Sequence, residues 1–178
     1  MMTQEIIFAG FGGQGILSMG KFLAFGGMDK GMNVSWCPSY GPEMRGGTAN
    51  CSVILSDEEI GAPIISAPDT IVVMNRPSLD KFEKTVKPGG LIILDSNLVT
   101  REVDRDDVTV IRIPSQTEAE AIGSAKIANM ILLGALVEKT GIISKDELLE
   151  SLKGHGKETF FEMNKNAIEK GIEYAKKA

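Results

Sequence analysis

The sequence predicts an α/β fold, a three-layer α/β/α sandwich around a mostly parallel sheet. Three observations predict it. Short apolar runs alternate with amphipathic, helix-like segments along most of the chain. The apolar runs are continuous rather than interrupted by polar residues, which is typical of strands buried on both faces. The first run ends in a glycine-rich turn, Gly10–Gly15, that leads directly into a helical pattern.

The N-terminal third is expected to hold three strands and one helix. Gln4–Ala9 is an apolar run that ends in glycines, so it predicts the first strand. Ile16–Met28 carries apolar residues at helical spacing and is expected to end near Gly31. Val34–Cys37 and Ala49–Leu55 are the next expected strands. Because no helix-forming stretch separates them, the third strand is expected to run antiparallel at an edge, which makes the sheet mixed.

The middle of the chain continues the alternation with strands, one short helix and further strands. Proline suits the first turn of that helix, and a Lys-Pro-Gly-Gly turn ends it. The expected elements are the strand Asp69–Met74, the helix Pro77–Val86, the strand Leu91–Leu94 and the strand Val108–Ile113.

Three helices are expected to close the chain. Ser115 or Thr117 is expected to cap a long helix over residues 118–139, whose interior 127–137 is nearly all apolar and should be deeply packed. Ser144 and Glu147 have the spacing of a capping box that opens a helix running to Leu152. Residues 159–176 form the last amphipathic pattern. Without repeats or linkers, residues 1–178 are expected to be a single domain.

Composition limits the function classes. The net charge of −5 argues against a nucleic-acid partner, and no apolar run approaches the roughly 20 residues that span a bilayer. Gln4 and Glu5 stand where a signal peptide would be basic, and the run Ile6–Ala9 is too short for one, so a cytoplasmic location is expected. One histidine and two cysteines are too few for most metal and iron–sulfur sites.

The glycine turn is the first candidate site. Its spacing, Gly10-x-Gly12-x-x-Gly15, matches the dinucleotide-binding pattern, in which the amides at a helix start favour an anion. The acidic residue that should close the second strand is missing, since that strand reads Val-Ser-Trp-Cys. Two alternatives remain open, namely contact with an anion or a partner, and simple packing of the first helix on the first strand. The candidate residues are Gly10, Gly12, Gly13, Gln14 and Gly15.

The second candidate site is the segment Ser39–Thr48, in which four of ten residues are Gly or Pro. Such a segment bends sharply and allows close approach of a ligand or another backbone. Arg45 offers a planar fork for a carboxylate or phosphate, whereas a weak surface ion pair between Glu43 and Arg45 is the alternative. The candidate residues are Ser39, Tyr40, Gly41, Glu43, Arg45, Gly46 and Gly47.

Four other conspicuous side chains are expected to be structural. Trp36 is expected in the core, and Cys37 and Cys51 are expected to be buried thiols. His155 lies between two glycines and is expected to be a solvated loop histidine rather than a catalyst.

The two glycine segments together resemble the gamma subunit of 2-oxoacid:ferredoxin oxidoreductases. The motifs that carry the resemblance are Gly10-Phe-Gly-Gly-Gln-Gly-Ile16 and Ser39-Tyr-Gly-Pro-Glu-Met-Arg-Gly-Gly-Thr48. The similarity continues in order through residues 53–60, Pro63, Asp69, Lys87–Gly90, Leu91–Asp95 and Ala128-Asn129. The form of the second motif looks most like subunits that act on 2-oxoglutarate or branched-chain 2-oxoacids.

The resemblance implies a subunit rather than a free-standing enzyme. In this family a 2-oxoacid and coenzyme A become acyl-CoA and carbon dioxide while ferredoxin is reduced, with thiamine diphosphate, Mg²⁺ and iron–sulfur clusters held mainly by alpha, beta and delta chains. No cofactor is expected on this chain alone and no residue is assigned as catalytic. The resemblance implies that Arg45 holds a carboxylate or a coenzyme A phosphate and that Glu43 orients it.

Three alternatives stay open from the sequence. The first is the small subunit of indolepyruvate ferredoxin oxidoreductase, which shares both glycine segments. The second is a stand-alone Rossmann-like oxidoreductase that uses NAD(P), and the third is a coenzyme A-binding module without activity.

Overall fold

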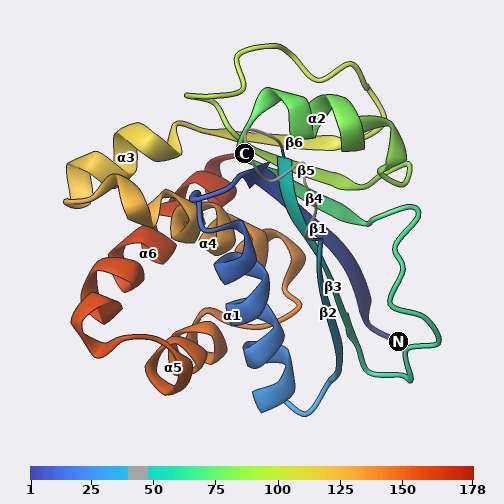
Figure 1. Cartoon of the computed structure of the whole chain (residues 1–178), viewed down its shortest axis with the longest axis horizontal. Coiled ribbons are helices and arrows are strands. Elements are labelled where there is room, and N and C mark those ends of the chain that lie inside the picture. Colours follow the sequence, from blue (N-terminus) through green and yellow to red (C-terminus); the bar gives the residue numbers. More distant parts are fainter. Residues whose placement is uncertain (40–47) are drawn as a thin grey trace.

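A single six-stranded sheet organises the described part of the chain, which is residues 1–39 and 48–178 of this computed structural model (Figure 1). The strand order is β2-β3-β1-β4-β5-β6. The strands are β1 (Thr3–Phe11), β2 (Asn33–Ser39), β3 (Thr48–Ser56), β4 (Thr70–Val73), β5 (Leu91–Asp95) and β6 (Thr109–Ile113).

The sheet is mixed because one strand runs against the others. β3 is antiparallel to both β1 and β2, whereas β1, β4, β5 and β6 are parallel. The predicted antiparallel direction of the third strand is therefore correct, but its predicted place at an edge is wrong, since β2 takes the edge. Buried Val53–Leu55 suits β3 to the interior, whereas β2 carries Pro38, which an edge strand tolerates.

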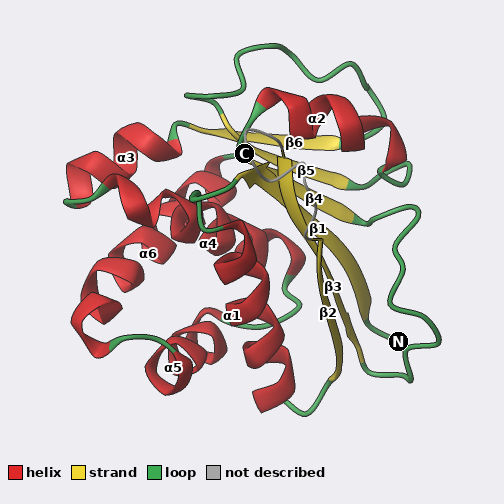
Figure 2. Cartoon of the chain, viewed as in Figure 1, coloured by secondary structure: helices red, strands yellow, loops and turns green. Residues whose placement is uncertain are grey.

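Helices cover both faces of the sheet, which confirms the predicted three-layer architecture (Figure 2). α2 packs on one face with β1, β4 and β5, and the remaining helices build the larger core on the other face. The helices are α1 (Ile16–Asp29), α2 (Arg76–Phe82), α3 (Ser115–Ile122), α4 (Ala128–Thr140), α5 (Lys145–His155) and α6 (Phe161–Lys177). Short 3₁₀ turns occur at η2 (Glu83–Thr85), η3 (Ala125–Ile127) and η4 (Glu158–Phe160).

The predicted long helix over residues 118–139 is wrong, because the chain forms α3 and α4 with a break between them. Gly123 has a φ of 142°, a conformation that a helix does not contain. The predicted caps are also wrong. The side chain of Asn97 accepts the N–H groups of Gln116 and Thr117 at 3.0 and 3.1 Å and so caps α3 from a distant loop. The predicted capping box of Ser144 and Glu147 is confirmed at the start of α5.

Helix α1 lies unusually close to the β2–β3 hairpin. A Cβ atom at Gly20 would stand 2.5 Å from Sγ of Cys51 and 3.1 Å from Nε1 of Trp36, so only glycine allows this approach. Burial raises the pKa of Cys51 to about 12, so its thiol stays protonated. That thiol donates to the carbonyl of Ile16, in the first turn of α1, at 3.6 Å.

Three predicted environments need correction. Trp36 is 36% exposed rather than in the core, because it lies on the edge strand. Cys51 is buried as predicted, but Cys37 is exposed. His155 ends α5 instead of lying in a loop, and its ring stacks on Phe25 with 3.8 Å between centroids.

A buried carboxylate fixes the connection between β5 and β6. Glu83 is 4% exposed and receives both guanidinium nitrogens of Arg101, at 2.7 and 3.4 Å, and the N–H of Asp104. Burial by itself raises the pKa of Glu83, but the hydrogen bonds and charge of Arg101 and the amide outweigh it and lower that pKa. This carboxylate therefore stabilises the fold above its unfolded pKa, and the contribution is lost as pH falls through the lowered folded pKa.

We expect Glu83→Ala to destabilise the fold by about 3 kcal/mol, because it leaves the Arg101 guanidinium without its partner. Denaturant unfolding followed by circular dichroism at neutral pH measures this. Glu150→Ala is the control, since Glu150 pairs with Lys153 on an exposed surface. In acid, the difference between wild type and Glu83→Ala should shrink. A constant difference down to the lowest pH at which wild type folds would contradict this role.

Candidate functional site

The glycine turn occupies the carboxyl edge of the sheet, at the point where helices leave toward opposite faces. α1 follows β1 onto one face, whereas α2 follows β4 onto the other, and β1 and β4 are neighbours (Figure 1). In open α/β sheets, ligands bind in the crevice outside the carboxyl ends of the strands at such a switch point. The predicted turn thus lies at the position where this topology favours binding.

Gln14 bridges that crevice. Its Oε1 accepts the N–H of Phe11 at 2.6 Å, and its Nε2 donates to the carbonyl of Met74, just beyond β4, at 3.2 Å. A Cβ at Gly10 would stand 2.5 Å from the same Oε1, so glycine at position 10 makes room for the bridge. Gly10 and Gln14 therefore act together to tie the turn to the neighbouring strand.

Asn129 holds the turn from the other side. It is 5% exposed within the apolar first turn of α4, and its Nδ2 donates to the carbonyl of Gly15 at 3.1 Å. Gly15 has a φ of 76° and directly precedes α1, and a Cβ there would collide with the Asn129 amide. Asn129 was not among the site residues predicted from the sequence. Two signals pointed to it, namely its position as the one amide in an apolar run and its inclusion in the family resemblance.

Two pockets flank the turn. One of about 310 Å³ is lined by Phe11, Gly12, the first turn of α1 and Ala49 of β3. The other, of about 220 Å³, is lined by Gly13, Gln14, Met74 and Gln116 and is bordered by Lys126. The first helical bond of α1 joins the N–H of Met19 to Gly15, so the amides of residues 16–18 precede it.

The ends of the second candidate segment meet the glycine turn at this edge. Thr48 pairs with Phe11, and Ser39 pairs with Asn50, which in turn pairs with Ala9. Ser39 is exposed at the end of β2. The other predicted residues of this segment lie outside the described residues: Tyr40, Gly41, Glu43, Arg45, Gly46 and Gly47. The structure thus brings the ends of the two predicted segments together.

Residues 5–174 match the model of a family described as pyruvate ferredoxin/flavodoxin oxidoreductase. The chain belongs to this family. The match confirms the family resemblance predicted from the two glycine segments, and it covers nearly all of the described structure.

Known members of this family that are similar to this chain are of two kinds. Some have about the same length, and others are much longer and match it over only part of their length. The gamma subunit of a keto/oxoacid ferredoxin oxidoreductase from Geobacter sulfurreducens has a TM-score of 0.87 and 31% identity, with 98% of this chain and 99% of that chain covered. A 2-oxoglutarate:ferredoxin oxidoreductase from Magnetococcus marinus, solved with 2-oxoglutarate, coenzyme A and succinyl-CoA bound, has a TM-score of 0.88 and 29% identity over all of this chain and 32% of that one.

Subunit VorA of the ketoisovalerate oxidoreductase from Methanothermobacter thermautotrophicus is 41% identical over 172 residues. That alignment covers 94% of this chain but 35% of the relative. The chain therefore spans about a third of the length of this relative.

The geometry does not fit a dinucleotide site, although the family shares the glycine pattern. In that fold the second strand lies beside the first and supplies the acid that binds the ribose. Here β3 separates β2 from β1, and β2 contains no acidic residue. The NAD(P) alternative is therefore disfavoured by topology as well as by sequence.

Within residues 1–39 and 48–178, no group of three or more His, Cys, Asp or Glu side chains is arranged to hold a metal ion. Cys37 and Cys51 lie on opposite faces of the hairpin, one exposed and one buried. In the same described ranges, no helix is long and apolar enough to cross a membrane.

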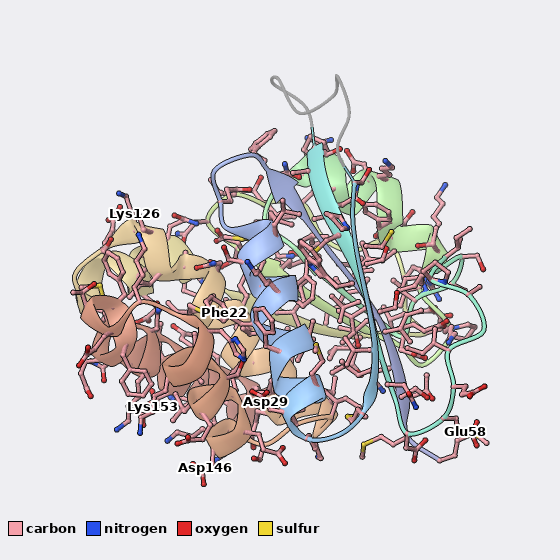
Figure 3. All side chains as sticks on the ribbon, turned by 60° about the horizontal axis from the view of Figure 1, so that its bottom comes forward. Phe22, Asp29, Glu58, Lys126, Asp146 and Lys153 are labelled. Carbon is pink, nitrogen blue, oxygen red and sulfur yellow. The ribbon has the colours of Figure 1, made fainter. Side chains whose placement is uncertain are left out.

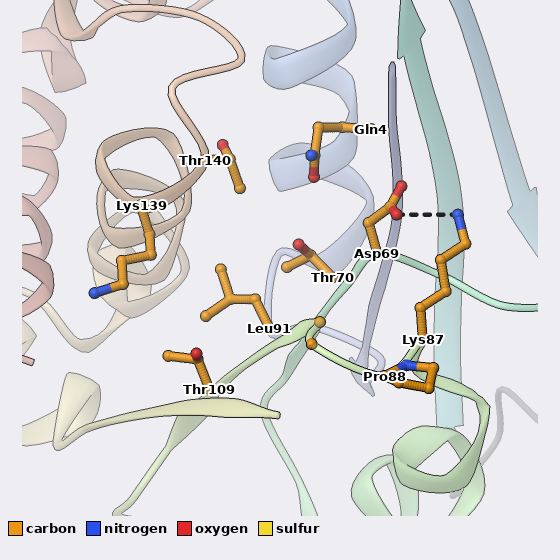
Figure 4. A pocket seen from close by; sticks show the side chains of 11 residues that line it. Gln4, Asp69, Thr70, Lys87, Pro88, Leu91, Thr109, Lys139 and Thr140 are labelled. Atoms are coloured by element: carbon orange, nitrogen blue, oxygen red, sulfur yellow. Dashed lines mark hydrogen bonds and ion pairs between the residues drawn. The ribbon is translucent and has the colours of Figure 1, made fainter. Parts of the chain in front are cut away.

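A further pocket, of about 360 Å³, lies at the opposite, amino edge of the parallel strands (Figure 4). Lys87 donates there to Glu5 at 2.7 Å and to Asp69 at 3.0 Å, and Asp69 also accepts the N–H of Glu5. Burial opposes the charged amine, but the bonds to both carboxylates raise the pKa of Lys87. These contacts join β1, β4 and the turn before β5. Asp69 and Lys87, which are among the residues that carry the family resemblance, therefore hold the strands together at this edge.

We expect Gly15→Ala to be much more destabilising than Gly13→Ala. Both residues have a positive φ, 76° and 88°, so either substitution costs about 1–2 kcal/mol in backbone strain. Only Gly15 faces Asn129, whereas the position of a Cβ at Gly13 is open, so Gly15→Ala should cost about 1–3 kcal/mol more. Chemical denaturation of the two variants measures the difference. Equal midpoints would show that Asn129 does not constrain the turn.

Proposed function

We propose that this chain is the gamma subunit of a thiamine diphosphate-dependent 2-oxoacid:ferredoxin oxidoreductase. The observation that carries the proposal is the full-length likeness to a gamma subunit, with 99% of that chain covered. The position of Ser39 and Thr48 supports it, because the two ends of the second glycine segment then lie beside the glycine turn at the carboxyl edge.

The complex would oxidatively decarboxylate a 2-oxoacid. One 2-oxoacid and coenzyme A give acyl-CoA, carbon dioxide and a proton, and the two electrons released reduce ferredoxin. Thiamine diphosphate supplies the electron sink for decarboxylation, and iron–sulfur clusters on other chains carry the electrons. The partners are alpha, beta and delta chains and, through the complex, ferredoxin, in the cytoplasm. We favour 2-oxoglutarate as substrate, with a branched-chain 2-oxoacid such as ketoisovalerate as the alternative.

The role of this chain is to shape the wall of the active site beside the coenzyme A region. Gln14 and Asn129 fix the glycine turn, so the amides at the start of α1 keep one orientation toward whatever covers the carboxyl edge. The segment that begins at Ser39 and ends at Thr48 extends the same wall. Arg45 then holds a carboxylate of substrate or neighbouring chain, or a phosphate of coenzyme A, and Glu43 orients the guanidinium.

Arg45→Ala in the assembled complex should lower kcat/KM by at least about tenfold for the oxoacid or for coenzyme A, because a charge-assisted hydrogen bond is lost. Ferredoxin reduction with each substrate varied in turn shows which ligand the guanidinium serves. Lys84→Ala is the control, since Lys84 is an exposed cation on η2. Unchanged kinetics and unchanged assembly in Arg45→Ala would contradict the assignment.

The substrate class is tested by isolating the complex with its natural partners. Affinity purification followed by mass spectrometry should recover thiamine-binding and iron–sulfur chains with this one. The purified complex should reduce ferredoxin faster with 2-oxoglutarate than with ketoisovalerate, pyruvate or indolepyruvate. Full turnover by this chain without companions would refute the subunit role, whereas another preferred oxoacid would correct only the substrate.

A further inference from the structure

An apolar groove lies between α1, the start of α4 and the corner where α5 meets α6. Its volume is about 380 Å³. Ile127 and Met130 form part of its floor at 4% and 3% exposure, and Phe22 of α1 lines one side. Phe160, on η4 at the other side, is 47% exposed. A half-exposed aromatic side chain beside buried apolar residues offers a contact surface for an apolar group of another molecule.

The rim of the groove is basic although the chain is acidic. Lys126 and Lys157 line it, and no carboxylate lines it, whereas His155, which also lines it, lies 3.5 Å from the carboxylate of Asp29. Neither lysine forms an ion pair with a described residue. The carboxylates that follow Lys157 in sequence, Glu158 and Glu162, line a separate pocket with Lys153. In a chain of net charge −5, this local excess of positive charge favours an acidic ligand.

The groove is continuous with the carboxyl edge. Ser18 borders both the groove and the pocket beside Gly12, and Lys126 borders both the groove and the pocket beside Gln14. The floor also includes Asn129, whose amide holds Gly15. Figure 3 shows Phe22 on α1 between the sheet and the C-terminal helices, and Lys126 at the start of those helices. The groove and the glycine turn are therefore close enough to contact the same partner molecule.

We infer that the groove receives a segment of a partner subunit in which an apolar side chain stands next to Asp or Glu residues. The apolar side chain fills the space between Phe22 and Phe160, and the carboxylates pair with Lys126 and Lys157. The inference rests on the proposed function, because it assigns the occupant to a subunit of the same complex. It adds a docking surface on the helical side, separate from the two glycine segments.

Zero-length carbodiimide cross-linking of the intact complex tests the chemistry of this contact directly, because the reagent joins only lysine amines and carboxylates that touch. Mass spectrometry should find Lys126 or Lys157 joined to an Asp or Glu of a partner subunit. Cross-links of both lysines exclusively to this chain, or none at either lysine while other intersubunit pairs form, would overturn the inference.

Charge reversal provides a matched test of affinity. Lys126→Glu combined with Lys157→Glu should weaken binding of this chain to the remaining subunits at least tenfold, and added salt should weaken wild-type binding as well. Phe160→Ala should weaken binding at least fivefold. The control is Lys176→Glu with Lys177→Glu, which makes the same charge change at the exposed end of α6 and should stay within twofold. Circular dichroism of each free variant verifies folding.

Other results of these experiments would point to a different occupant of the groove. Normal assembly of the groove variants with a raised KM for coenzyme A would assign the groove to a small ligand, which contradicts a docking segment. Wild-type dimers that Phe160→Ala dissociates would assign it to a second copy of this chain, with the same consequence. Normal affinity of all groove variants would also refute the inference but leave the proposed function intact, since that function is tested by Arg45→Ala activity and by the partners that co-purify.

Discussion

The hydrogen bond from Asn129 to the carbonyl of Gly15 is the constraint on which the carboxyl edge depends. A buried amide inside an apolar helix is costly unless its hydrogen bonds are satisfied, so its place in α4 has a specific reason. That reason is the left-handed Gly15 at the start of α1, whose carbonyl accepts the Asn129 amide as well as the N–H of Met19. Gln14 completes the arrangement from the side of β4. The turn is thus fixed by two side-chain amides.

This arrangement explains how a chain with so few reactive groups belongs to an oxidoreductase family. The parallel strands β1, β4, β5 and β6 form a rigid base. At their amino edge, the bonds of Lys87 to Glu5 and Asp69 join β1, β4 and the turn before β5. The carboxyl edge then carries the backbone amides of the glycine turn and the two strand ends at Ser39 and Thr48, and the basic groove lies beside it. Under the proposed function, each of these features contacts another molecule of the complex. The division of labour proposed for the complex is therefore consistent with the physical character of this surface.

The sequence predicted features that depend on local chemistry. The glycine turn, the capping box of Ser144 and the direction of the third strand all follow from nearby residues. The errors concern contacts between residues far apart in the chain. Asn97 caps α3 from 19 and 20 positions away, which no local pattern reveals. The edge position of β2 exposes Trp36, because edge position depends on which strands pair in the finished sheet. The break at Gly123 was visible as a glycine, but the apolar pattern beyond it outweighed that signal.

The glycine that lets α1 rest on the hairpin has a mechanical consequence. With Gly20 against Cys51 and Trp36, the helix and the two strands have no intervening layer that might absorb a displacement. We therefore expect the turn that precedes α1 and the strand ends at Ser39 and Thr48 to move together as one rigid unit. A molecule that docks on the glycine turn and displaces it would then displace the ends of β2 and β3 by a similar amount, and the reverse would also hold.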